Sequence, residues 1–102
     1  MQYLSKIEEM NVIVLSETQE IFRNVDPMGF ISMGKDDDIY NRISESLQRH
    51  LINLKLFPTI YNLAYTILAL LKASFSNLNP SFEYCVEISR QLIQKCLRKA
   101  SK

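Results

Sequence analysis

Residues 79–102, NPSFEYCVEISRQLIQKCLRKASK, form the stretch that most clearly decides the fold. Asn79 is a residue type that caps helices, and Pro80 suits the first helical position because its missing N–H is not needed there. The apolar and small residues that follow recur at helical spacing: Phe82, Cys85, Val86, Ser89, Leu92, Ile93, Cys96, Leu97 and Ala100. This stripe predicts an amphipathic helix with one face in a core.

A first helix is predicted from Gln2 to about Asn24. One face of this segment carries apolar residues at helical spacing: Tyr3, Ile7, Met10, Val14 and Ile21. The turn Asp26-Pro27-Met28-Gly29 ends the pattern, since proline suits the second position of a turn and glycine tolerates positive φ. The loop that follows is too apolar for a free linker, so part of it should fold back onto the bundle through Met28, Phe30, Ile31 and Met33.

Two further helices are predicted in the middle of the chain. The second opens at Asp36-Asp37-Asp38, whose carboxylates suit the positive end of a helix dipole. Its apolar stripe consists of Ile39, Ile43, Leu47, Leu51 and Leu54. The third starts at Phe57-Pro58-Thr59 and is apolar almost all round from Ile60 to Leu71. We therefore expect the third helix to be central and most buried, with Leu68 in the core.

Length and composition fit a single helical domain over residues 1–102. The chain has 102 residues, of which 47% are hydrophobic and 23% charged, so it has enough apolar material for one modest core. Only two glycines occur and no segment alternates as a strand does, which favours helices with few breaks. Four amphipathic helices joined by short connections predict an antiparallel four-helix bundle.

The charge pattern bears on partners and location. A formal net charge of +1 gives no overall attraction to nucleic acid, so no nucleic-acid partner is expected. The N-terminal residues MQYLSKIEEM carry acidic side chains where an export signal would be basic and then apolar. The most apolar run, residues 60–71, is shorter than the ~20 residues of a spanning helix. We expect a soluble, cytoplasmic protein.

Few residues offer catalytic or metal chemistry. His50 is the single histidine, and its place beside the second apolar stripe predicts packing at the core boundary. Cys85 and Cys96 lie about 16 Å apart on one helix, too far to pair, and are expected to be buried thiols. Asp36-Asp37-Asp38 lacks the alternating ligands of a calcium loop and is interpreted as a helix start. No enzyme activity, metal or cofactor is predicted.

Two features of the sequence are compatible with a binding function. The end of the last helix carries Lys95, Arg98, Lys99 and Lys102. These charges complement the helix dipole, or they form a patch for anionic lipid or an acidic partner, with weak and salt-sensitive lipid contact. The five tyrosines (Tyr3, Tyr40, Tyr61, Tyr65 and Tyr84) are expected at the edge of the core, the alternative being an exposed partner surface.

Residues 35–75, KDDDIYNRISESLQRHLINLKLFPTIYNLAYTILALLKASF, resemble the immunity proteins of pediocin-like bacteriocins, the enterocin A immunity family. Members of this family often have an acidic start to the second helix, a spaced aliphatic stripe, and an asparagine-leucine step into a third helix with aromatic and small residues. The residues at those places here are Asp38, Ile39, Leu47, Asn62, Leu63, Tyr65 and Ile67.

The resemblance implies a cytosolic binding protein of Gram-positive bacteria. Such proteins act at the inner membrane face, where they recognise the mannose phosphotransferase permease with its bound bacteriocin and keep the pore from staying open. On this hypothesis the basic end of the last helix contacts the partner or the anionic membrane surface. The alternative is a small helical adaptor or regulatory protein that docks a partner helix in a groove.

Overall fold

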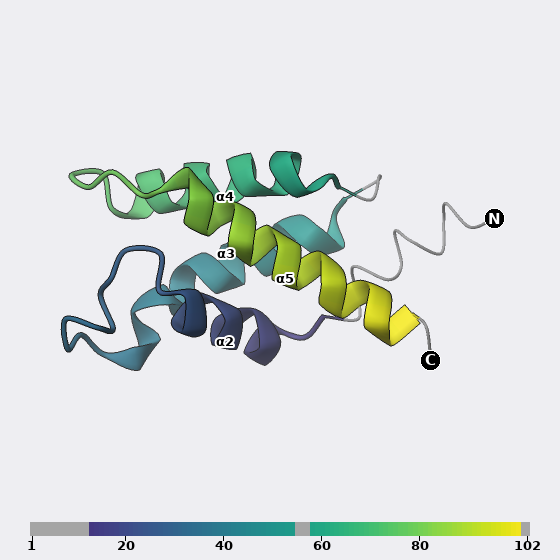
Figure 1. The fold of residues 1–102 in the computed structure, drawn as a ribbon, viewed down its shortest axis with the longest axis horizontal. Coiled ribbons are helices and arrows are strands. Elements are labelled where there is room, and N and C mark those ends of the chain that lie inside the picture. Colours follow the sequence, from purple (N-terminus) through teal and green to yellow (C-terminus); the bar gives the residue numbers. More distant parts are fainter. Residues whose placement is uncertain (1–12, 55–57, 101–102) are drawn as a thin grey trace.

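The computed structural model describes residues 13–54 and 58–100, which form a bundle of four α-helices (Figure 1). The element order is α2 (Leu15–Val25), the 3-10 helix η1 (Asp37–Tyr40), α3 (Asn41–Ile52), α4 (Ile60–Ser74) and α5 (Phe82–Ala100). Within this described part of the chain there is no β-strand. The prediction of an all-α helical bundle is confirmed.

The four helices surround one common core. α2 packs on α3 and α5, and α4 packs on the same two helices. Figure 1 shows the chain turning back after each helix, so that α2 and α4 run in one direction while α3 and α5 run in the other. The core is a single cluster that includes Ile21, Phe22, Phe30, Tyr40, Ile43, Leu47, Leu51, Leu63, Ile67, Leu71, Ile88 and Leu92.

The expectation that the third helix is central and most buried is wrong. α4 buries only Leu63, Ala64, Ile67 and Leu71. Leu68, expected in the core, is partly buried. Each helix of a four-helix bundle has one side that faces away from the core. Apolar residues on that side do not become buried. α4 therefore leaves apolar residues exposed.

The first helix is shorter than predicted. α2 begins at Leu15, because Val14 is extended (φ −89°, ψ 159°) and acts as the N-cap residue. The Glu17 carboxylate accepts the N–H of Val14 at 3.0 Å, which satisfies one donor at the helix start. Ile13 is buried, whereas Val14, expected on the core face, is 52% exposed. Tyr3, Ile7 and Met10 lie outside the described residues.

The loop after α2 folds back in part, as expected. Phe30 is buried and its ring packs on Tyr40 and Phe75, with centroids 6.0 and 4.9 Å apart. Met33 is 64% exposed and does not contribute. Asp36 precedes η1 without a side-chain capping bond, so the acidic run opens a 3-10 turn rather than the α-helix itself.

Both later helices start just after the positions predicted for them. The Thr59 hydroxyl accepts the N–H of Asn62 at 3.1 Å and caps α4, so proline at 58 lies outside the helix. α5 begins at Phe82, and Asn79 therefore does not cap it. The buried face of α5 consists of Cys85, Ile88, Ser89, Leu92, Ile93 and Cys96. Ile88 was not in the predicted stripe, and Leu97, which was, is 43% exposed.

Candidate functional site

The basic end of α5 lies beside the start of α2. The Nζ atom of Lys95 is 3.6 Å from Oε2 of Glu17, and Lys99 forms an ion pair with Oε1 of the same carboxylate. Glu17 also accepts the backbone N–H of Val14. One carboxylate of α2 thus holds two cations of α5 and caps its own helix. Lys102 lies outside the described residues.

The environment of Glu17 favours its charged form. Burial by itself raises the pKa of this carboxyl. The hydrogen bonds from Lys99 and from the backbone of Val14, together with the charges of Lys99 and Lys95, outweigh burial and leave the pKa below its ordinary value. The Glu17 side chain is only 22% exposed, so its pairing is less screened than that of a fully exposed ion pair. Lys95 and Lys99 therefore join α5 to α2.

Arg98 is the predicted site residue that the structure leaves exposed. It lines a hollow of about 400 Å³ between α2 and α5, together with Lys95 and the acidic residues Glu20 and Glu87. Glu87 in turn forms an ion pair with Arg90. The hollow beside Arg98 is therefore lined by mixed charge, with carboxylates from α2 and α5 and two of the predicted cations.

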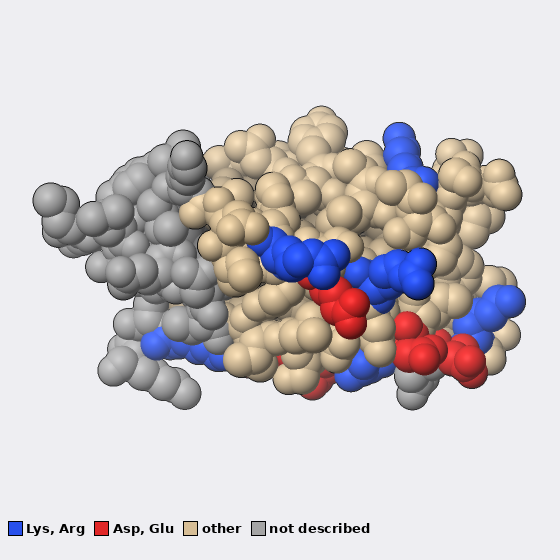
Figure 2. All heavy atoms as spheres, turned by 180° about the vertical axis from the view of Figure 1, so that it is seen from behind, with Lys and Arg blue, Asp and Glu red and all other residues tan. Residues whose placement is uncertain are grey.

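The outer face of α4 carries an exposed aromatic cluster. Tyr61 is 63% exposed and Tyr65 is 61% exposed. The ring of the partly buried Phe82 lies 6.3 Å from Tyr61 and 4.7 Å from Tyr65, centroid to centroid. Figure 2 shows the upper part of the molecule, where α4 runs, with few charged side chains. In α4 the one charged residue is Lys72.

The five tyrosines do not share the expected position at the edge of the core. Tyr40 is fully buried, and Tyr84 is 48% exposed. Tyr61 and Tyr65 lie mostly outside the core, and the rings of both contact the ring of Phe82. Tyr3 lies outside the described residues. For Tyr61 and Tyr65 the structure favours the alternative, an exposed cluster.

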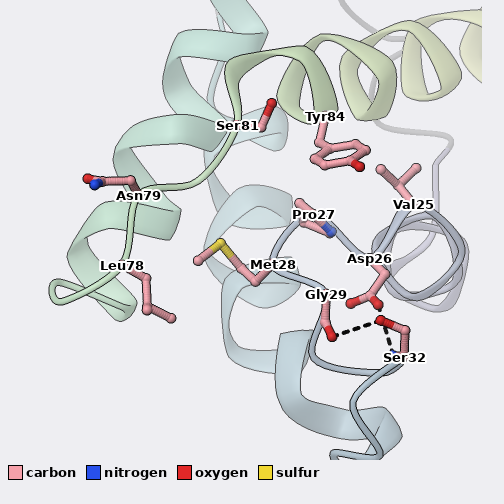
Figure 3. A pocket seen from close by; sticks show the side chains of 10 residues that line it. All are labelled: Val25, Asp26, Pro27, Met28, Gly29, Ser32, Leu78, Asn79, Ser81 and Tyr84. Carbon is pink, nitrogen blue, oxygen red and sulfur yellow. Dashed lines mark hydrogen bonds between the residues drawn. The ribbon is translucent and has the colours of Figure 1, made fainter.

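A cavity of about 560 Å³ lies between the loop after α2 and the segment leading into α5 (Figure 3). Its lining includes Asp26, Ser32, Ser81 and Tyr84. Asp26 has φ 51°, in the left-handed region of the backbone. Asp26 accepts the N–H groups of Ile31 and Ser32 at 3.2 and 3.0 Å. The carboxylate is therefore engaged in holding the loop.

The Tyr40 hydroxyl completes this network. It donates to Oδ1 of Asp26 at 2.6 Å and accepts the backbone N–H of Met28 at 3.0 Å. Burial raises the pKa of Asp26, but the hydrogen bonds from Tyr40, Ser32 and Ile31 outweigh it, so the pKa lies below its ordinary value. Burial and the Asp26 carboxylate raise the pKa of Tyr40 well above its usual range. The proline and glycine of this turn are visible in the sequence, but nothing in the sequence marks the hydrogen bonds that link it to Tyr40.

The residues considered for catalysis or metal binding lie apart. His50 is exposed, so the prediction of boundary packing is wrong. Cys85 and Cys96 are buried, as expected, and both remain thiols. Burial raises the pKa of Cys85 to about 11, which keeps the thiol protonated at neutral pH. Among the described residues, no group of histidine, cysteine, aspartate and glutamate side chains is placed to bind a metal ion.

Known proteins give no further guide to the use of these surfaces. In the part of the chain that the structure describes, no helix has the length and apolar character needed to cross a membrane. Searches against protein-family models, curated proteins and solved structures give no match for this chain.

Proposed function

We propose that this protein is a bacteriocin immunity protein: a cytosolic binding protein that protects a Gram-positive cell from a pediocin-like bacteriocin at the mannose phosphotransferase permease. The observation that supports the proposal is the helical arrangement of residues 36–54 and 58–75, the described parts of the stretch with the resemblance. In α4, Leu63 and Ile67 enter the core while Asn62 and Tyr65 are exposed. Leu63 of the asparagine-leucine step thus packs in the core, while Asn62 and the aromatic Tyr65 lie at the surface.

Within this proposal, the contact with the permease or the membrane uses the exposed Arg98. Lys95 and Lys99 already share the Glu17 carboxylate, so part of their charge is neutralised within the bundle. A cation that is exposed and lies at a helix end can reach an anionic surface at little structural cost. The contact is expected to weaken with salt, because exposed charges are screened over about 8 Å at physiological ionic strength.

The test is protection of a sensitive Gram-positive strain that expresses the protein. Growth inhibition is measured across a panel of pediocin-like bacteriocins for the wild type, Arg98→Gln and Arg90→Gln. Arg90 is the matched control, since it lies on the same helix, is 51% exposed at its side chain and pairs with Glu87. We expect the wild type and Arg90→Gln to protect against at least one bacteriocin, and Arg98→Gln to protect less at equal expression.

Lys95 and Lys99 are left unchanged in this design. Neutralising them would also remove the ion pairs with Glu17 and would mix a loss of stability with a loss of recognition. If no bacteriocin in the panel is countered, the proposal fails. If Arg98→Gln protects as well as the wild type, the immunity function stands but Arg98 is not its contact residue.

The second candidate is a helical adaptor that docks a partner helix. The exposed, uncharged face of α4 around Tyr61 and Tyr65 favours it. Aromatic residues on a helix face are typical anchors of helix-to-helix recognition. Failure of the bacteriocin panel would make this adaptor function the better proposal.

A further inference from the structure

The outer side of α4 carries one continuous row of exposed residues. Tyr61, Tyr65, Ala69 and Ala73 follow each other at intervals of four, and all four are exposed. Residues at i, i+4 and i+8 form a ridge on the helix surface, and such ridges interdigitate when two helices pack with their axes about 50° apart. We call these four residues the α4 ridge.

The α4 ridge is self-complementary in size. Its first half has two large aromatic side chains and its second half has two small ones. Consider a two-fold axis that crosses the outer surface of α4 level with residue 67, midway between Tyr65 and Ala69. It would place Tyr65 opposite Ala69 of a second copy and Tyr61 opposite Ala73, because both pairs are symmetric about residue 67. In an isologous contact each residue pair occurs twice. Each tyrosine would therefore meet an alanine, and no two large side chains would face each other.

The charge on α4 permits such a contact. Lys72 is its one charged residue, and it lies five residues from the axis. The two Lys72 residues would be about 15 Å apart along the helix direction at 1.5 Å per residue, which exceeds the screening length of about 8 Å. A parallel arrangement would instead bring the two lysines together.

The tyrosine rings are also held in place before any partner arrives. Phe82 on α5 packs against both rings, at 6.3 Å from Tyr61 and 4.7 Å from Tyr65. Side chains that are already ordered lose less entropy when they are buried in an interface. This support from α5 does not cover the outer surface of either tyrosine, since both remain more than 60% exposed.

We propose that the α4 ridge is a homodimer contact, formed by two antiparallel copies of α4 around a two-fold axis at Ile67. The occupant is a second copy because α4 itself supplies the small residues that its tyrosines need. A tyrosine contributes roughly 150–250 Å² when fully buried, and Tyr61 and Tyr65 are 63% and 61% exposed, so together they would add only about 190–310 Å² per copy. This is less than the ~800 Å² per partner of a standard interface, and the dimer is expected to be weak.

The first test is sedimentation equilibrium over a concentration series up to about 1 mM, where weak association becomes measurable. The wild type is compared with Ala69→Glu, which places a charge on the ridge, and with Gln94→Glu, which places one at an exposed position of α5. We expect the apparent mass of the wild type and of Gln94→Glu to rise with concentration. Ala69→Glu should stay monomeric while its circular dichroism spectrum remains that of a folded helical protein.

The second test checks the register. Purified Tyr65→Cys and Ala69→Cys proteins are mixed and oxidised, and the disulfide-linked dimers are compared with those of each protein alone. The proposed axis predicts more cross-linking in the mixture, because residues 65 and 69 face each other. A wild type that is monomeric throughout, association of Ala69→Glu equal to the wild type, or no excess in the mixture would overturn the proposal. So would a monomer that uses the ridge to bind vesicles or another helix, detected by loss of that binding in Ala69→Glu.

Discussion

Tyr40→Phe removes one hydroxyl from the interior and breaks two hydrogen bonds. The hydroxyl donates to the Asp26 carboxylate at 2.6 Å and accepts the N–H of Met28 at 3.0 Å. A hydrogen bond to a charged group stabilises by about 1.5–3 kcal/mol, and a donor left without a partner costs up to about 1–3 kcal/mol more when it is buried. Met28 is partly buried. We therefore expect a loss of about 2–4 kcal/mol in the free energy of unfolding.

The measurement is urea unfolding followed by far-UV circular dichroism. In a domain of this size, each kcal/mol lowers the melting temperature by about 4–8 °C, so thermal unfolding should shift by at least about 8 °C. Tyr84→Phe is the matched control, because Tyr84 is 48% exposed and its change should stay within about 0.5 kcal/mol. A loss below about 0.5 kcal/mol for Tyr40→Phe would refute the reasoning, since the network would then not hold the loop.

The same variant has a testable pH dependence. The pKa of Asp26 is lowered in the folded protein, so its contribution to stability is present above its ordinary pKa of 3.8 and is lost as pH falls through the lower folded value. Tyr40→Phe removes a bond that lowers this pKa. The difference in stability between wild type and variant should therefore narrow below about pH 3.8.

Three further predictions concern burial and ion pairing. Ile67→Asp should lower the free energy of unfolding by more than about 4 kcal/mol or prevent folding, because Ile67 is fully buried. Leu68→Asp should cost less, because Leu68 is only partly buried. Equal losses of the two variants in urea unfolding would contradict this order. Cys85 should react slowly with a thiol reagent in the folded protein and quickly in denaturant, while rapid labelling of the folded protein would show that α5 is not packed. Glu17→Gln should cost about 1 kcal/mol at pH 7. Its cost should fade below about pH 4.5, because the lowered pKa of Glu17 gives stability that is lost as pH falls; a cost independent of pH would exclude the ion pairs as its cause.

The helices could be predicted because their apolar residues recur at helical spacing, but their ends depend on local chemistry that the spacing does not encode. The sequence predicts helix starts around Pro58 and at Pro80, since proline suits the first turn of a helix. In both places a hydroxyl residue follows the proline, and the helix begins only after it, at Ile60 and Phe82. The break at Val14 had no such marker, since neither glycine nor proline occurs there.

The candidate site could be predicted only as residue types. Lys95 and Lys99 were expected to present charge to a partner, and the sequence gives no sign that Glu17, about 80 residues earlier, lies beside them. Such pairs depend on which helices are neighbours in the bundle. The exposure of Tyr61 and Tyr65 depends on the same arrangement, because a helix that is apolar all round does not reveal which of its sides faces outward.

The two proposed contact surfaces, the one at Arg98 and the α4 ridge, would bind through different interactions. They can therefore be tested separately. Arg98 would act through charge, so added salt should weaken its contact. The α4 ridge contains no charged residue, so an association through Tyr61 and Tyr65 should change little over the same range of salt. The ion pairs of Glu17 are not the only link between α2 and α5. Both helices also contribute buried residues to the common core, Ile21 from α2 and Leu92 from α5. Raising the salt concentration should therefore weaken the Arg98 contact while leaving the α4 ridge contact and the common core in place.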